Sequence, residues 1–126
     1  MEIKNLDHLV LTVANVESTC KFYNVALGME IITFGADRKA LKFGNQKINL
    51  HQHRCELEPK AFKPMPGTAD LCFITETNID EVVNELKQNC IEIEEGPVER
   101  TGANGKIVSI YLRDPDLNLI EISNYI

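Results

Sequence analysis

This chain of 126 residues has no tryptophan and no apolar run long enough to span a bilayer. Its start, MEIKNLDHLV, lacks the basic segment and the following apolar stretch of a secretion signal, so we expect a cytosolic protein with no membrane partner. Positive charge is scarce, because 13 Lys and Arg stand against 19 Asp and Glu, for a net charge of -6. Nucleic acids select clustered Lys and Arg, so we expect no nucleic-acid partner and a small molecule instead.

Cysteine is also too sparse for a disulfide scaffold. The chain has no C-x-x-C pair and no zinc-finger spacing among its four cysteines, which are Cys20, Cys55, Cys72 and Cys90. In the absence of a secretion signal, this spacing predicts reduced thiols. We expect Cys72 to be a small buried hydrophobe and not a ligand.

An internal repeat organises what the sequence does contain. LDHLVLTV at 6–13 and TADLCFIT at 68–75 are each followed by a segment with helical apolar spacing and then by a further strand pattern. The predicted N-cap and C-cap residues are Asn15 and Gly28 in the first half and Asn78 and Asn89 in the second. Each half therefore begins with strand, helix and strand.

Three short strand patterns follow each predicted helix. They lie near 30–35, 38–43 and 47–52 in the first half and near 91–98, 107–113 and 118–124 in the second, divided by the turn signals GNQ, TGANG and DPD. We therefore predict an α+β fold of two βαβββ modules in a single domain, with module one at 1–56, a proline-rich linker at 57–68 and module two at 69–126. One module buries only one sheet face well, so the two must share surface within a chain or with a partner chain.

Strand alternation predicts that each sheet has an apolar face for its helix and a polar face. The polar face collects groups that bind metals or protons, which are His8, Asn49 and His51 in the first half and Asp70 and Glu121 in the second. His8 and Asp70 stand at matching positions of the repeat, and Asn49 and Glu121 at approximately matching positions. Glu121 is the most unusual strand residue, because an ionised carboxylate between apolar neighbours is costly unless it is paired, ligated or solvated.

Each of these residues also has a purely structural explanation. His8 could be a hydrogen-bonded residue at a strand start, Asp70 could end a turn, and His51 could mark a solvated strand end. The combination is more specific, because imidazole together with carboxylate oxygen suits a divalent Zn, Fe, Mn, Ni or Co ion with open positions for water and substrate. If the polar faces border a common cavity, these residues converge on it.

The pattern of these residues resembles that of the vicinal oxygen chelate superfamily. This superfamily includes glyoxalase I, fosfomycin-resistance thiol transferases, extradiol dioxygenases and bleomycin-resistance proteins. The resemblance covers essentially the whole chain, since DHLVLTVANVESTCKFYNVALGM resembles the opening βα unit and YLRDPDLNLIEI the closing hairpin. More narrowly, FGNQKINLHQ, GTADLCFIT and GPVERTGANGKIVSIYLRDPDLNLIEISNY resemble the glyoxalase domain-containing protein 5 group, often described as lactoylglutathione lyase-like. The resemblance implies cupped mixed sheets around a metal and substrate cavity, and a homodimer.

The resemblance also implies roles for single residues. His8 matches the family's first-strand metal histidine, and Glu121 matches its last-strand metal glutamate. Asp70 stands where glyoxalase I has a second histidine and Asn49 where it has a glutamate, so the glyoxalase I ligand set is incomplete. The third metal ligand is then Asp70 or His51, and we expect weak or no glyoxalase turnover.

The carboxylates of the metal face, Glu121 and Asp70, are the candidate catalytic bases. The glycine-rich segment ERTGANGK at 99–106 carries two cations that could close over an anionic substrate group, although a solvated hairpin loop explains the segment too. The candidate substrate-binding residues are Asn49, Arg100, Lys106, Tyr111 and Arg113. Leu117 replaces the glycine usual in the family's DP-x-GN turn, and we expect this to alter only the turn.

Three functions follow from the resemblance. The first is a divalent-metal-dependent enzyme acting on a small oxygenated metabolite or electrophile, as a lyase, an isomerase or a thiol transferase with a thiol co-substrate. The second is a metal-free protein of the bleomycin-resistance type that binds or sequesters a small molecule. The third is an extradiol-type dioxygenase that uses Fe(II) or Mn(II).

Overall fold

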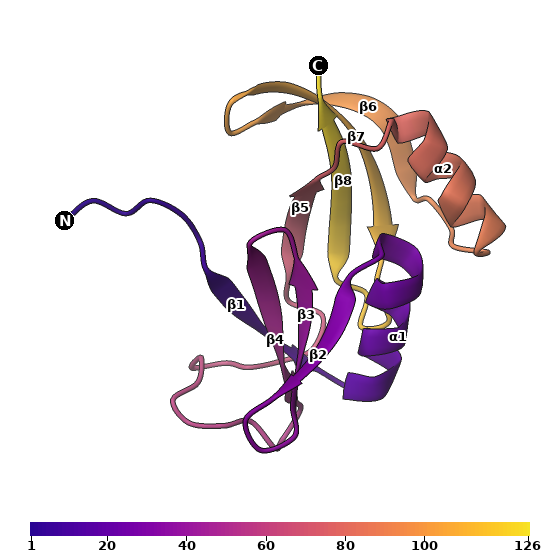
Figure 1. The fold of residues 1–126 in the computed structure, drawn as a ribbon. Helices are drawn as coiled ribbons and strands as arrows, with labels where there is room; N and C mark the ends of the chain where they lie inside the picture. Colours follow the sequence, from indigo (N-terminus) through magenta and orange to yellow (C-terminus); the bar gives the residue numbers. More distant parts are fainter. The chain divides into compact units, whose positions relative to one another are not determined.

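The computed structural model describes residues 1–126 and divides into two compact units, Met1–Pro66 and Gly67–Ile126, each with one helix and a four-stranded sheet (Figure 1). The first unit contains β1 (His8–Val13), α1 (Val16–Leu27), β2 (Glu30–Phe34), β3 (Arg38–Phe43) and β4 (Gln46–Gln52). The second contains β5 (Asp70–Ile74), α2 (Ile79–Gln88), β6 (Glu95–Gly102), β7 (Gly105–Arg113) and β8 (Leu119–Tyr125). The predicted α+β fold of two βαβββ units is confirmed. Neither helix has the length and apolar character needed to cross a membrane.

The two sheets have the same topology. Their strand orders are β1-β4-β3-β2 and β5-β8-β7-β6. In each sheet the first and last strands of the unit pair in parallel, and the remaining pairs are antiparallel. Each sheet is therefore mixed, and the last strand of each unit lies inside its sheet, between two neighbours.

The predicted caps fix both ends of each helix. Asn15 Oδ1 accepts a hydrogen bond from the Ser18 backbone N–H at 2.8 Å, and Gly28 ends α1 in the left-handed conformation with φ 64°. Asn78 Oδ1 accepts from the Asp80 N–H at 2.9 Å at the start of α2, and Asn89 is its C-cap. The cap predictions are confirmed.

Each helix covers the apolar face of its own sheet. α1 packs mainly against β3, and α2 against β7. Tyr23 of α1 and Leu41 of β3 are fully buried, as are Ile110 and Ile120 in the second unit. Burial of each large apolar side chain stabilises the fold by about 1.5–3 kcal/mol, so the helix side of each sheet is the core and the opposite side is left for polar residues.

The position of β6 differs from the prediction. The strand predicted at 91–98 starts only at Glu95, because Cys90 has a left-handed φ of 57° that redirects the chain after α2. Pro97 has no N–H for the ladder, and the register shifts between Glu95 and Val98 before regular pairing with β7 begins. Local alternation alone does not reveal this shift.

The predicted glycine-rich loop is also smaller than expected. Gly102 pairs with Gly105, so only two residues, at 103 and 104, form the turn between β6 and β7. The Asn104 N–H donates to Tyr125 Oη at 3.1 Å and ties the turn to the end of β8. The segment at 99–106 is therefore a regular hairpin.

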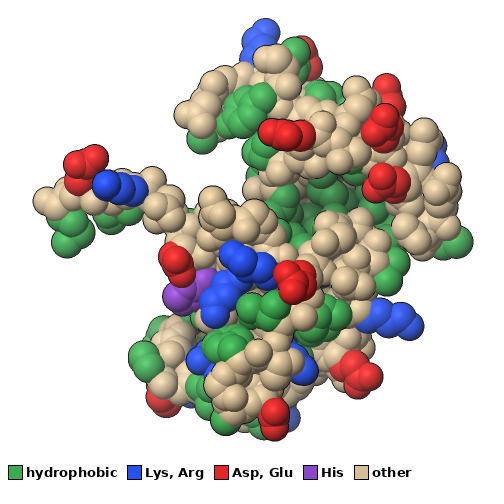
Figure 2. All heavy atoms as spheres, viewed as in Figure 1, with side chains coloured by type: hydrophobic (Ala, Val, Ile, Leu, Met, Phe, Trp, Pro, Cys, Tyr) green, Lys and Arg blue, Asp and Glu red, His purple; other side chains and the backbone are tan.

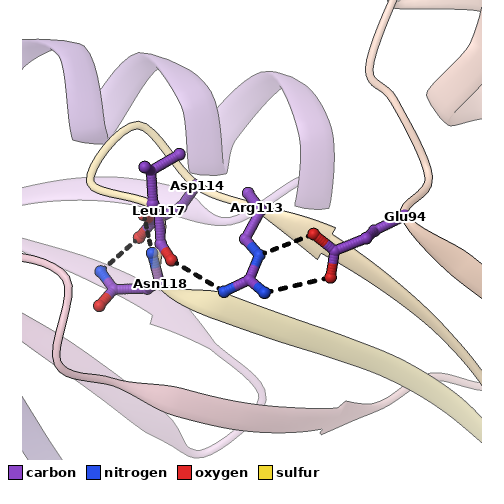
Figure 3. Close-up of polar contacts among 5 residues, drawn as sticks. All are labelled: Glu94, Arg113, Asp114, Leu117 and Asn118. Atoms are coloured by element: carbon purple, nitrogen blue, oxygen red, sulfur yellow. Dashed lines mark hydrogen bonds and ion pairs between the residues drawn. The ribbon is translucent and has the colours of Figure 1, made fainter.

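A buried aspartate organises the turn between β7 and β8 (Figure 3). The Asp114 carboxylate accepts hydrogen bonds from the Asp116 N–H at 2.9 Å, the Asn118 N–H at 3.0 Å and Asn118 Nδ2 at 2.8 Å. Asp114 and Asn118 are both buried. Leu117, between them in the chain, is exposed and has φ 65°, a conformation that favours glycine.

Candidate functional site

The strand registers place the polar candidates at equivalent positions of the two sheets. Asn49 of β4 is the parallel partner of Val10, and Glu121 of β8 is the parallel partner of Cys72. His8 and Asp70, the first residues of β1 and β5, each stand two residues before those partners. Asn49 and Glu121 are therefore structural equivalents, as the repeat predicted for their positions.

His8 has one ring nitrogen already engaged. Its Nδ1 lies 2.7 Å from Asp7 Oδ2, and its side chain is about half exposed. This hydrogen bond holds the pKa of Asp7 below its usual range. An acceptor at Nδ1 favours the tautomer in which Nε2 presents a lone pair, which is the arrangement of metal-binding histidines. Asp7 was not among the residues predicted from the sequence, although it directly precedes His8.

Asn49 and His51 are both buried on the polar face of the first sheet. The Oδ1 of Asn49 has no hydrogen-bond partner. Burial lowers the pKa of His51, and the nearby Arg38 charge lowers it further. His51 is therefore held neutral, with a lone pair that a cation or a donor can use.

Glu121 lies within a small polar network on the second sheet. Ser123 Oγ donates to Glu121 Oε1 at 3.4 Å and lies 2.7 Å from the Oγ of Ser109. Tyr111 is the cross-strand partner of Glu121, and its Oη accepts from Arg100 Nε at 3.0 Å. Burial raises the pKa of Tyr111, the Arg100 hydrogen bond lowers it, and Glu121 adds a further rise. A protonated phenol thus stands beside the carboxylate.

Cys72 differs from its prediction as a buried hydrophobe. The residue is exposed, and its Sγ lies 3.4 Å from Ser123 Oγ on the face that carries Glu121. Partial desolvation raises the pKa of this thiol, and the charges of Glu121 and Asp70 add to the rise. Cys72 lies on edge strand β5, which leaves one side of the residue open.

The remaining predicted substrate residues divide between the two faces of the second sheet. Arg100 lies on β6, where it pairs with Glu95 at 3.2 Å and hydrogen-bonds Tyr111. By strand alternation Lys106 lies on the helix side of β7, away from Glu121. Arg113 lies on the same face of the sheet as Glu121. Its guanidinium is already bound, because it donates to both Glu94 carboxylate oxygens at 3.1 Å and to the Leu117 carbonyl (Figure 3).

The donor groups of the candidate metal site are divided between the units. The first unit offers His8, Asn49 and His51, and the second offers Asp70 and Glu121. No group of three or more His, Cys, Asp or Glu side chains is placed to hold a metal ion. In the second unit Tyr111 lies opposite Glu121 and accepts a hydrogen bond from Arg100, and in the first unit Asp7 lies beside His8.

Known proteins resemble this chain along its whole length. Virulence protein STM3117 of Salmonella typhimurium is 61% identical over 126 residues, which make up all of this chain and 88% of the relative. Its crystal structure has a TM-score of 0.99 to this chain, with 100% of each chain covered. The glyoxalase domain-containing protein RDO1 of Mycosarcoma maydis is 52% identical over 125 residues, 99% of this chain and 70% of the relative.

A more distant structure shares the fold. The lactoylglutathione lyase from Agrobacterium tumefaciens is 21% identical and has a TM-score of 0.74, with 98% of this chain and 96% of that chain covered. The family model of the Glyoxalase/Bleomycin resistance protein/Dioxygenase superfamily matches residues 5–122. This chain therefore belongs to the Glyoxalase/Bleomycin resistance protein/Dioxygenase superfamily.

Proposed function

We propose that this chain is a divalent-metal-dependent enzyme of the glyoxalase type, acting on a small oxygenated metabolite or electrophile. The observation that carries the proposal is the Asp7–His8 pair at the first residue of β1, with 2.7 Å between Nδ1 and Oδ2. A carboxylate on one ring nitrogen orients the other toward a cation. Glu121, which matches the family's metal glutamate, is the second ligand in this proposal.

The donor chemistry of the polar faces fits such an ion. Asn49 Oδ1 is buried and without a partner, so it has a lone pair to offer a cation or a hydrogen-bond donor. His51 is held neutral by burial, as an imidazole ligand must be. We propose His51 or Asp70 as the third ligand, in a set of nitrogen and oxygen donors that suits Zn, Ni, Co, Mn or Fe.

A bound divalent ion would supply Lewis-acid stabilisation of negative charge on adjacent substrate oxygens. The chain's own residues handle the proton. Glu121 or Asp70 accepts it as general base, and Tyr111, the cross-strand partner of Glu121, stands beside that carboxylate as a protonated phenol. Reaction types that fit this set are lyase, isomerase and transfer of a thiol co-substrate.

Metal analysis of untagged protein tests the proposal. We expect about one divalent ion per chain in the parent protein, and loss of the ion together with any activity when His8 and Glu121 are both changed to Ala. Comparing His51→Gln with Asp70→Asn then identifies the third ligand. If the double variant kept its metal and its turnover, the proposed metal enzyme would be wrong.

A second candidate is a metal-free binder of small molecules, as in bleomycin resistance. It is favoured by one observation, that no three-residue cluster of metal-ligating side chains is present. For this function Asn49, His51 and Glu121 would hydrogen-bond the ligand directly. Protein that carries no ion after growth in metal-supplemented medium, yet binds ligand, would favour this candidate.

A further inference from the structure

The polar face of the first sheet carries more positive charge than the proposed metal site uses. Lys42 and Lys47 are cross-strand partners on this face, and Arg38 lies two residues before Ala40, the partner of Asn49. None of the three cations forms an ion pair. Figure 2 shows Lys and Arg side chains gathered beside a histidine over β1 and β4. The chain as a whole is acidic, with a net charge of -6, so this surface is a local exception.

Two of these cations converge on one aromatic ring. Lys47 Nζ lies 3.9 Å from the centroid of the Phe34 ring, and Arg38 Cζ lies 4.7 Å from it. Attraction to the ring offsets only part of the repulsion between two like charges held this close. Asp7 is bound to His8. The charge of Asp7 also acts on Lys47 and Lys42. No carboxylate forms an ion pair with any of the three cations, so they are open to an anion from solution.

An unpartnered acceptor lies between the two cations. Asn49 stands two residues from Lys47 on β4, and its partner Ala40 stands two residues from Arg38 on β3. Asn49 is 5% exposed, and its Oδ1 has no hydrogen-bond partner. A buried carbonyl oxygen without a donor is costly, which calls for a ligand that brings an O–H or N–H group.

We propose that Arg38, Lys47 and Asn49 bind a small oxyanion that carries its own hydroxyl group, such as a hydroxycarboxylate or a monoprotonated phosphate. The guanidinium and the ammonium donate to the charged oxygens, and Asn49 Oδ1 accepts the hydroxyl hydrogen. As a substrate class this inference rests on the proposed enzyme function. As a binding site it requires no metal.

Phosphate and sulfate are a matched pair of probes. At mildly alkaline pH both are dianions of similar size, but only phosphate keeps an O–H group. In calorimetry on metal-free protein with EDTA at low salt, we expect phosphate to bind roughly tenfold more tightly than sulfate, because only phosphate satisfies Asn49. A comparison of glycolate with acetate repeats the test for carboxylates. Comparing the two pairs of probes shows whether the site prefers a hydroxycarboxylate or a phosphate.

Three substitutions assign the contacts. Asn49→Leu should remove the preference for phosphate over sulfate, and Arg38→Gln and Lys47→Gln should each weaken both anions about tenfold. Lys39→Gln is the matched control, because Lys39 lies on the same strand but the opposite face and donates to Thr33 Oγ1 at 2.6 Å. The control should bind both anions as the parent protein does.

Equal affinity of the parent protein for phosphate and sulfate would overturn the proposal. Unchanged anion binding in a folded Arg38→Gln, Lys47→Gln double variant would also overturn it. This double variant provides the test if Asn49→Leu does not fold. Because EDTA is present, the outcome is independent of the metal. A chain that discriminates the anions but never binds a metal contradicts only the proposed enzyme function, and a metal-binding chain that fails to discriminate contradicts only the oxyanion site.

Discussion

Leu117 adopts a backbone conformation that suits glycine. Its φ is 65°, and its side chain is 68% exposed, so burial offsets little of the strain. We expect Leu117→Gly to raise the free energy of unfolding by about 1 kcal/mol, measured by urea denaturation. Leu57→Gly is the matched control, because Leu57 is also exposed but has no positive φ. A loss of stability in Leu117→Gly would contradict the strain assigned to this turn.

His51 gives the fold a pH dependence with a defined sign. Its folded-state pKa lies below the usual histidine value of 6.5, first because of burial and then because of the Arg38 charge. The unfolded chain therefore binds the proton more readily, so the stabilising contribution is present above pH 6.5 and is lost as pH falls through the folded-state pKa. We expect His51→Gln to have a smaller decline of unfolding free energy than the parent protein just below that pH. Parallel pH profiles of the two proteins would show that His51 titrates as it does in the unfolded chain.

Tyr111 should act on metal binding only through Glu121. If its hydroxyl orients the carboxylate, Tyr111→Phe weakens metal affinity by roughly tenfold to a hundredfold, the usual effect of removing a partner of a metal ligand. Tyr125→Phe is the control, since Tyr125 bonds the β6–β7 turn and not Glu121. The measurement is metal titration by calorimetry, and equal affinities in both variants would exclude the positioning role.

At the scale of single residues, the sequence predicted the sheet face of a side chain better than its contacts and its exposure. Strand alternation placed Glu121 on the polar face of its sheet, and the register shows that Tyr111 and Arg113 lie on the same face. Strand alternation did not predict that the Glu94 carboxylate binds the Arg113 guanidinium. It also did not predict that Cys72, on edge strand β5, is exposed. Those properties depend on neighbours distant in sequence, which local patterns do not encode.

The β7–β8 turn is the element most dependent on one side chain. Three donors converge on the buried Asp114 carboxylate, two of them backbone N–H groups. Asp114→Ala leaves them without their acceptor, and we expect a loss of about 2–4 kcal/mol of unfolding free energy. The neighbouring exposed ion pair of Arg113 and Glu94 is screened by solvent, so Arg113→Met should cost much less unfolding free energy than Asp114→Ala. A milder effect of Asp114→Ala than of Arg113→Met would contradict this ranking.

Helices were more predictable than strands at the scale of elements. Asn15, Gly28 and Asn78 act through contacts a few residues away, so their capping roles are visible in sequence. The start of β6 is set by the left-handed Cys90 and by the register shift around Pro97. Both features depend on how β6 pairs with β7, and the periodicity of the sequence does not reveal that pairing.

At the scale of the whole molecule, duplication is the property that the sequence showed most directly. The repeat gave two βαβββ units, and the identical strand orders confirm it. The homodimer stays a prediction, which sedimentation equilibrium would test against the 14.2 kDa mass of one chain.

We propose that His8 and Glu121 bind one cation. A double-mutant cycle of metal affinity tests this proposal, with His8→Ala, Glu121→Ala and the double variant titrated with the same divalent ion by calorimetry. If both residues bind one ion, each single change should weaken binding by at least about tenfold, and the double variant should lose less than the sum of the two free-energy changes. Additive losses, or a single variant that binds the ion as tightly as the parent protein, would show that His8 and Glu121 do not share a cation.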